Sequence, residues 1–135
     1  MMRRSAERSA GRSEKGQSLV EFSLVLPIFL FLLVGIAEFG RAWMTRNILT
    51  GAAREAVRIA AVQGNSSSAT ARANNILSSA GINGASVVLN DDGTAYGTCA
   101  ATVSYNFPLA VAGFLPGLSG TSIPLSSSTS MRKEF

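Results

Sequence analysis

Glu21 is the one ionisable residue in an apolar stretch that covers residues 19–37. Most other residues of this stretch are Leu, Val, Ile or Phe. An ionised carboxylate in an apolar helix of bilayer length is costly unless it has a partner, so such residues usually have a function. A local alternative is a capping box, in which Ser18 and Glu21 satisfy the first backbone N–H groups of a helix. The two interpretations differ in the partner that they assign to the Glu21 carboxylate.

Few other residues are of the types needed for catalysis or metal binding. The chain has no histidine and a single cysteine, Cys99. This composition removes Cys–His catalysis, the usual zinc sites and an intrachain disulfide. Asp91 and Asp92 are adjacent in a predicted turn, where a pocket for acid–base chemistry has no support. We expect a non-enzymatic protein with no catalytic residue, no metal site and no cofactor.

The positive charge of the chain is concentrated at its N-terminus. The 135 residues carry a net charge of +4, and residues 1–16 account for +3 of it. A basic segment beside an apolar run predicts a cytoplasmic N-terminus and an external C-terminal part. The remaining residues are nearly neutral, so we expect no binding to nucleic acid.

The apolar run predicts a single membrane-spanning helix at residues 17–38. A secretory signal peptide is the competing interpretation, but its apolar core is usually about 7–15 residues long and ends in a small-residue cleavage motif. This run is longer, and residues 35–38 fit that motif poorly. We therefore divide the chain into a basic leader (1–16), this helix and an external part.

Helix-forming residues continue beyond the apolar run, which predicts one helix from residue 18 to about residue 62. Pro27 should kink or locally open it. At 1.5 Å per residue the helix is much longer than the roughly 30 Å hydrocarbon core, so residues 39–63 should project outside the membrane. The Gly- and Ser-rich sequence from Gly64 onwards should end the helix.

Residues 64–135 predict a small α+β outer domain. A short helix is expected at residues 68–80, and strands at 86–90, 98–107 and 123–131, which form an antiparallel sheet of two to three strands. In the second strand, Cys99 lies on the apolar face with Ala101 and Val103, so it should be buried. Small residues at helical spacing in the long helix favour packing on this chain's own sheet over packing on a partner helix: Ala53, Ala56, Val57, Ala60 and Ala61. Arg54 and Arg58 lie on another face, which we expect to be solvated.

Several segments together resemble the TadE-like family, the minor pilins or pseudopilins of tight-adherence (Tad/Flp) pilus systems. The resemblance rests on residues 16–22, 26–27, 35–41, 52–60 and 130–134. It implies cleavage after Gly16 by a membrane-bound prepilin peptidase, which leaves Gln17 as the new N-terminus. It also implies storage in the bacterial inner membrane, followed by assembly with other pilin subunits and the Tad machinery into an adhesive pilus.

In this family pattern Glu21 and Phe22 would set the register of assembly, with the Glu21 carboxylate paired to the free amine of a neighbouring subunit's Gln17. Pro27, Glu38, Arg41 and Trp43 would belong to the helix interface. Glu38 and Arg41 also fit a solvated ion pair three residues apart. Trp43 fits a membrane-interface anchor or a packing residue of the outer domain.

A rival function is a single-pass, membrane-anchored binding module that never polymerises. It needs the same apolar helix and the same outer domain. The sequence leaves the two open, because neither an adhesion ligand nor a polymer contact has a recognisable motif here.

Overall fold

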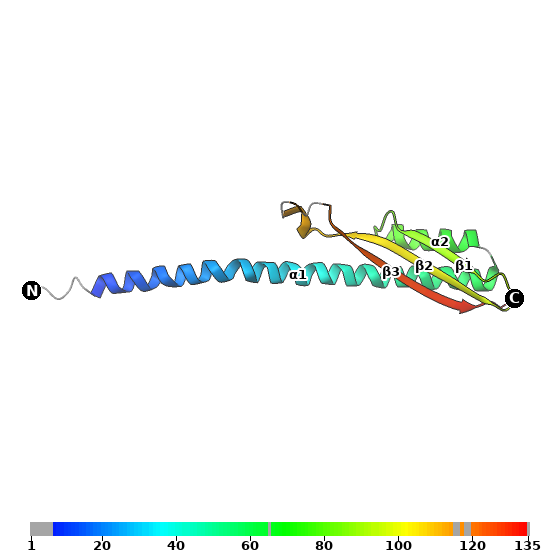
Figure 1. Cartoon of the computed structure of the whole chain (residues 1–135), viewed down its shortest axis with the longest axis horizontal. Coiled ribbons are helices and arrows are strands. Elements are labelled where there is room, and N and C mark those ends of the chain that lie inside the picture. The colour runs from blue at the N-terminus through cyan, green and yellow to red at the C-terminus, as the bar shows by residue number, and fades with distance from the viewer. Residues whose placement is uncertain (1–6, 65, 115–116, 118–119, 135) are drawn as a thin grey trace, which may run out of the picture. The chain divides into compact units, whose positions relative to one another are not determined.

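The computed structural model of the protein describes residues 7–64, 66–114, 117 and 120–134. The chain divides into two compact units, Met1–Ala37 and Glu38–Phe135. The long helix α1 (Glu7–Gln63) contributes to both units (Figure 1). It begins earlier than the predicted residue 18. The leader from Glu7 onwards is rich in Arg, Ala, Glu and Lys and lacks proline, so its intrinsic helix propensity is high despite Gly11.

In the first unit, α1 runs through the apolar stretch as one helix, with Pro27 inside it. All side chains from Gly16 to Ala37 are exposed. The helix is long and apolar enough to cross a membrane, and none of its most apolar window is buried. It therefore differs from the core helix of a soluble protein, whose apolar face is covered by the rest of the fold.

The second unit contains the outer part of α1 and the elements that follow it. These are α2 (Ser66–Ser79), β1 (Ser86–Asp91), β2 (Thr98–Pro108), the 3₁₀ helix η1 (Val111–Phe114) and β3 (Ser122–Arg132). The predicted α+β class is confirmed, and all three strands lie where the alternating pattern placed them. The predicted loop between β2 and β3 contains the short helix η1.

The three strands form an antiparallel meander in the order β1-β2-β3. Val103 in the central strand pairs with Val87 on one side and with Ser127 on the other. Since side chains alternate between the faces of a sheet, one face of β2 is buried. Cys99, Ala101 and Val103 are at most 2% exposed. The predicted burial of Cys99 is confirmed.

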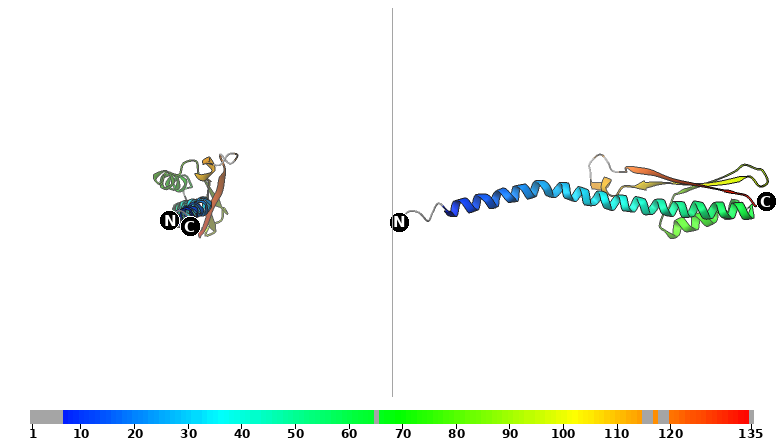
Figure 2. Two further views of the ribbon diagram at one scale, coloured as in Figure 1. Left: turned by 90° about the vertical axis from the view of Figure 1, so that its left-hand side faces the viewer. Right: turned by 90° about the horizontal axis from the view of Figure 1, so that it is seen from below.

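The core of this unit lies between α1, α2 and the sheet. The alanine-rich face of α1 is buried here, as are Ala69 and Ala73 of α2. Figure 2 shows α2 and the sheet on different sides of the outer part of α1. Alanine adds little bulk, so small residues let elements approach closely while Leu49, Leu77 and Val103 fill the remaining space. The small-residue face therefore packs within its own chain, as predicted.

Gly81 ends α2 in a left-handed conformation, with a φ of 74°. Its amide donates to the carbonyl of Ser78, and the amide of Ile82 donates to the carbonyl of Leu77. This pair of hydrogen bonds is a Schellman motif, which satisfies carbonyls at the helix end. It also places Ile82 beside Leu77 in the core and directs the chain towards β1.

Candidate functional site

Gly16 and Gln17 lie inside α1, on its exposed surface. Apart from the backbone of the helix itself, no atom lies within 4 Å of the position that a Cβ on Gly16 would occupy. The Gln17 side-chain amide donates a hydrogen bond of 3.2 Å to Oε1 of Glu21, four residues later. The peptide bond expected to be cleaved is therefore helical in the uncleaved chain.

Glu21 has a local partner, but not the one that a capping box requires. Ser18 lies within α1, whereas the capping serine must stand at the N-terminus of its helix. The capping-box interpretation is thus wrong for the uncleaved chain. The Gln17 amide is neutral and cannot balance the charge of a carboxylate. Glu21 would still gain from a cation in apolar surroundings.

The residues around Glu21 present an open apolar surface. Leu19, Phe22, Leu24 and Ile28 are each more than 60% exposed, and Pro27 is also exposed. A continuous apolar surface of this extent is typical of contact with lipid or with another protein. Phe22 and Pro27 are thus available for the assembly contacts that the sequence predicts.

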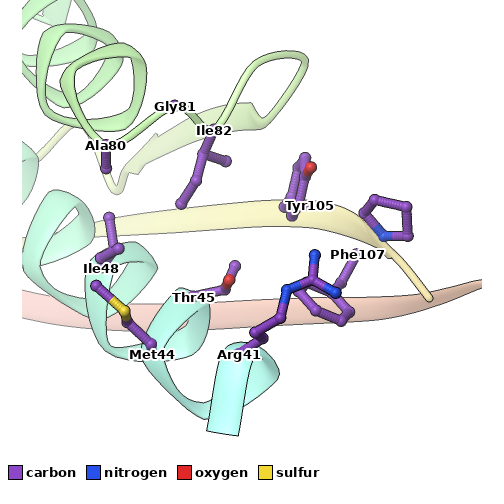
Figure 3. A pocket seen from close by; sticks show the side chains of 10 residues that line it. Arg41, Met44, Thr45, Ile48, Ala80, Gly81, Ile82, Tyr105 and Phe107 are labelled. Atoms are coloured by element: carbon purple, nitrogen blue, oxygen red, sulfur yellow. The ribbon is translucent and has the colours of Figure 1, made fainter. Parts of the chain in front are cut away.

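Glu38 and Arg41 form the predicted ion pair, at 2.8 Å between Glu38 Oε1 and an Arg41 guanidinium nitrogen. The Glu38 side chain is only 12% exposed. Its other oxygen accepts a hydrogen bond of 3.4 Å from the backbone amide of Ala110. The Arg41 guanidinium lies 5.1 Å from the centre of the Phe107 ring (Figure 3). The pair is therefore more than a solvated contact, because it holds α1 to the end of β2 and the loop that follows.

Figure 3 also shows a small pocket beside this contact, with a volume of 240 Å³. It lies between the outer part of α1, the turn after α2 and the end of β2. Most of its lining is apolar, and Arg41, its one charged residue, is already paired with Glu38. These residues offer no arrangement for acid–base or nucleophilic chemistry.

Trp43 is 57% exposed, so it does not pack in the outer domain. It stacks on Phe39, with the ring centres 6.2 Å apart and an angle of 28° between the rings. Phe39 is 69% exposed. The two rings form an exposed aromatic pair on α1, which agrees with the interface interpretation of Trp43.

Reasoning from the sequence missed a charged cluster at the far end of the sheet. The Lys133 side chain is 5% exposed, and its Nζ lies 2.5 Å from Asp91 Oδ1 and 3.4 Å from Asp92 Oδ1. The Lys133 ammonium lowers the pKa of Asp91, and Asp91 in turn raises the pKa of Lys133. Hydrogen bonds from the backbone amides of Thr98 and Thr94 are the main reason why the pKa of Asp92 falls to about 2.

Backbone contacts tie the same C-terminal segment to the rest of the unit. The Lys133 amide donates to the carbonyl of Gly97 at 2.8 Å, and the Glu134 amide donates to the carbonyl of Ala61 at 3.2 Å. The Arg132 guanidinium donates to the carbonyl of Tyr96 at 3.0 Å. The segment 130–134, which the sequence singled out only by family resemblance, therefore connects β3, the β1–β2 turn and the end of α1.

Metal binding finds no support among the described residues, where no group of three His, Cys, Asp or Glu side chains could hold an ion. The carboxylates of Asp91 and Asp92 are already occupied by Lys133 and by backbone amides. The cluster is therefore built to hold the fold together.

Residues 16–58 match the model of the TadE-like protein family. The resemblance drawn from the sequence motifs is confirmed for this segment, whereas residues 59–60 and 130–134, which also carried the resemblance, lie outside the match. No curated protein and no solved structure matches the chain. The TadE-like segment ends inside α1, so α2 and the sheet lie outside it. It contains every residue to which the sequence assigned a role: Gly16, Gln17, Glu21, Phe22, Pro27, Glu38, Arg41 and Trp43.

Proposed function

We propose that this protein is a minor pilin or pseudopilin of a Tad/Flp-type pilus. The observation that carries the proposal is the exposed apolar helix, with Glu21 as its lone carboxylate, directly after Gly16 in the TadE-like segment. A prepilin peptidase would cleave after Gly16, and the helix would stay in the mature protein. Residues 1–16 would face the cytoplasm, and residues 39–135 would lie outside the inner membrane.

Processing would change the electrostatics at Glu21. The Gln17 side chain offers a neutral donor, whereas cleavage creates a positively charged α-amine at Gln17. An amine of a neighbouring subunit would compensate the carboxylate in apolar surroundings and so fix the axial register. Assembly would exchange lipid contacts of the apolar side chains for contacts between helices, so extraction from the membrane is energetically feasible.

The role we propose is structural, with no enzymatic step carried out by this chain. Its residues bind neighbouring subunits, the prepilin peptidase and the assembly machinery in turn. The protein would contribute to adhesion as part of the pilus.

N-terminal mass spectrometry of the membrane-fraction protein tests the proposal. We expect Gln17 as the first residue in cells with an active prepilin peptidase. Pyroglutamate formed from Gln17 after extraction would report the same cleavage, although it lacks the free amine. The same protein from cells without the peptidase should keep its leader. A Gly16→Leu variant is a matched control and should keep its leader in cells with an active peptidase. The substitution should leave the helix intact, since Gly16 has open space around it.

Met1 or Met2 retained in peptidase-positive cells would overturn the proposal. The rival function, an anchored binding module, predicts that the protein remains in the membrane fraction. A pilus subunit should also appear in the sheared surface fraction or with the assembly complex.

A further inference from the structure

Gly51 lies in the middle of α1, where a glycine lowers helix stability relative to alanine. Nothing in the second unit requires a glycine there: apart from the helix backbone, no atom lies within 4 Å of the position that its Cβ would occupy. Gly51 forms part of a groove of 430 Å³ between α1 and α2. A residue without a side chain is useful in such a place when another molecule approaches closely.

The rim of this groove carries positive charge. Arg72 of α2 lines it, with a side chain that is 55% exposed. Its nearest carboxylate is Glu55, at 3.7 Å from Nε, but both oxygens of Glu55 accept hydrogen bonds from Arg58, at 2.9 and 3.0 Å. One carboxylate thus faces two guanidinium groups. The groove therefore combines an apolar floor, formed by Ile48 and Ile76, with a cation whose charge is only partly balanced.

The same unit carries a group of complementary chemistry on another face of α1. Phe39 and Trp43 form the exposed aromatic pair described above. At 100° per residue, Trp43 and Gly51 lie about 80° apart around the helix axis. An aromatic face attracts a guanidinium group, and tryptophan does so most strongly. A single copy cannot bring the two surfaces together, because both lie on one rigid helix.

We propose that the groove between α1 and α2 receives the Phe39–Trp43 pair of a second copy of this chain. The inference rests on the proposed function and deepens it by naming a contact between subunits. The two surfaces differ, so the contact is heterologous and continues from copy to copy. Trp43 precedes Gly51 by eight residues, so neighbouring copies with parallel helices would be displaced by about 12 Å along α1.

Disulfide crosslinking of the full-length chain in membranes of intact cells tests this contact. Gly40→Cys and Asn75→Cys are placed together in a Cys99→Ala background, so that Phe39 and Trp43 are both retained. Gly40 lies between the two aromatic residues along α1 and has open space around it, and Asn75 lines the groove and is exposed. Oxidation should give covalent dimers and higher multimers. The matched control replaces Gly40→Cys by Val62→Cys, since Val62 is 46% exposed but lies about 33 Å further along α1. The control should give at least tenfold less crosslinked product.

A second variant tests the groove itself. Gly51→Leu, added to the Gly40/Asn75 cysteine pair, should fit the folded chain because its side chain enters open space. It should lower the crosslinked fraction at least tenfold, because the leucine side chain occupies the space that the aromatic pair would enter. An unchanged crosslinked fraction in this variant, or an equal crosslinked fraction in the Val62 control, would overturn the inference. An absence of covalent multimers would overturn it as well, and shielding of Gly40→Cys from water-soluble thiol reagents by the membrane alone would then assign the aromatic pair to lipid. Mass spectrometry of the same samples reports cleavage after Gly16 separately, so the proposed function can stand when the contact fails.

Discussion

The carboxylate of Glu21 accepts a hydrogen bond from a neutral amide on an otherwise apolar, exposed helix surface. Its position costs free energy in a bilayer and would gain from a cation. The proposed amine of a neighbouring subunit supplies one after processing. Under the proposed function, Glu21 would therefore lack a cation during storage in the membrane and gain one on assembly.

Glu21→Ala should be cleaved and inserted into the membrane as efficiently as the wild-type chain, or slightly better, because a charge is removed from an apolar helix. Assembly should fail, since the paired charge that fixes register is lost. Cell fractionation, N-terminal mass spectrometry and quantification of the sheared pilus fraction measure the three steps. Normal assembly of the variant would rule out an essential Glu21–amine pair.

Lys133 is the second single residue with a distinct electrostatic role, and it lies in the second unit. It is a buried ammonium held by two adjacent carboxylates, Asp91 and Asp92, which would repel each other without it. The cluster joins the last residues of the chain to the β1–β2 turn.

Acid should weaken this cluster. The pKa of Asp92 is lowered to about 2, mainly by the Thr98 and Thr94 amides, and that of Asp91 is also lowered. Carboxylates with depressed pKa values stabilise the fold above their ordinary pKa of about 3.9, and this contribution is lost as the pH falls through the folded value. Thermal unfolding midpoints should therefore drop between about pH 4 and pH 2.

The matched variant Asp92→Asn should have a lower midpoint at pH 7 and a flatter pH dependence below pH 4. Parallel curves for the variant and the wild type would show that Asp92 contributes nothing to acid sensitivity. At alkaline pH the sign reverses for Lys133. Its raised pKa keeps its contribution intact up to the ordinary value of about 10.4, and the contribution is lost above the folded value.

At the scale of elements, the alanine face of α1 decides how closely α2 and the sheet approach. Ala52, Ala53 and Ala56 are fully buried and share one cluster with Ala73 of α2 and Ala101 of β2. A larger side chain has no free volume there, in contrast to Gly51, which faces open space.

Ala56→Leu should therefore lower the free energy of unfolding by about 1–3 kcal/mol, the usual cost of overpacking a core. Arg54→Leu is the matched control, because Arg54 lies on the exposed face of the same helix turn and its replacement should change stability by no more than about 0.5 kcal/mol. Chemical denaturation followed by circular dichroism measures both. Equal stability of the two variants would mean that the alanine face is not closely packed.

At the scale of the whole molecule, the two units differ in how far their apolar side chains are buried. The apolar side chains of residues 19–37 are exposed. In the described part of the chain, by contrast, the main cluster of buried apolar side chains lies between Leu49 and Val103, and Phe107 and Ala112 are also buried. The second unit thus contains its own core and does not depend on the apolar run for burial.

A fragment of residues 38–135 should therefore be soluble and folded, with a mixed helix and strand spectrum by circular dichroism and a cooperative thermal transition. The fragment should start at Glu38, because the Glu38 carboxylate accepts a hydrogen bond from the backbone amide of Ala110. A fragment beginning at residue 42, which lacks both Glu38 and Arg41, is the control and should unfold at lower temperature. A disordered 38–135 fragment would show that the outer unit needs the membrane helix or a partner to fold.

The sequence by itself determined the two α-helices, the three strands and the TadE-like segment, whereas the 3₁₀ helix η1 lies in a segment predicted as a loop. Continuous apolar residues, the alternation around Cys99 and the glycine at position 81 are local signals that do not depend on distant residues. The start of α1 was missed, because a charged leader suggests disorder while its helix propensity favours continuation of the helix. Which residues of α1 would be buried was also predictable, since small residues at helical spacing mark one face.

Only the tertiary structure decided the partners of the charged and aromatic residues. Lys133 lies 42 positions from Asp91, and Glu38 lies 72 positions from Ala110, so no spacing rule connects them. The register of β2 with β1 and β3 brings the first pair together, and the chain reversal after β2 brings the second. The groove at Gly51 and the exposure of Trp43 arise in the same way, because open space beside a residue depends on how distant elements pack.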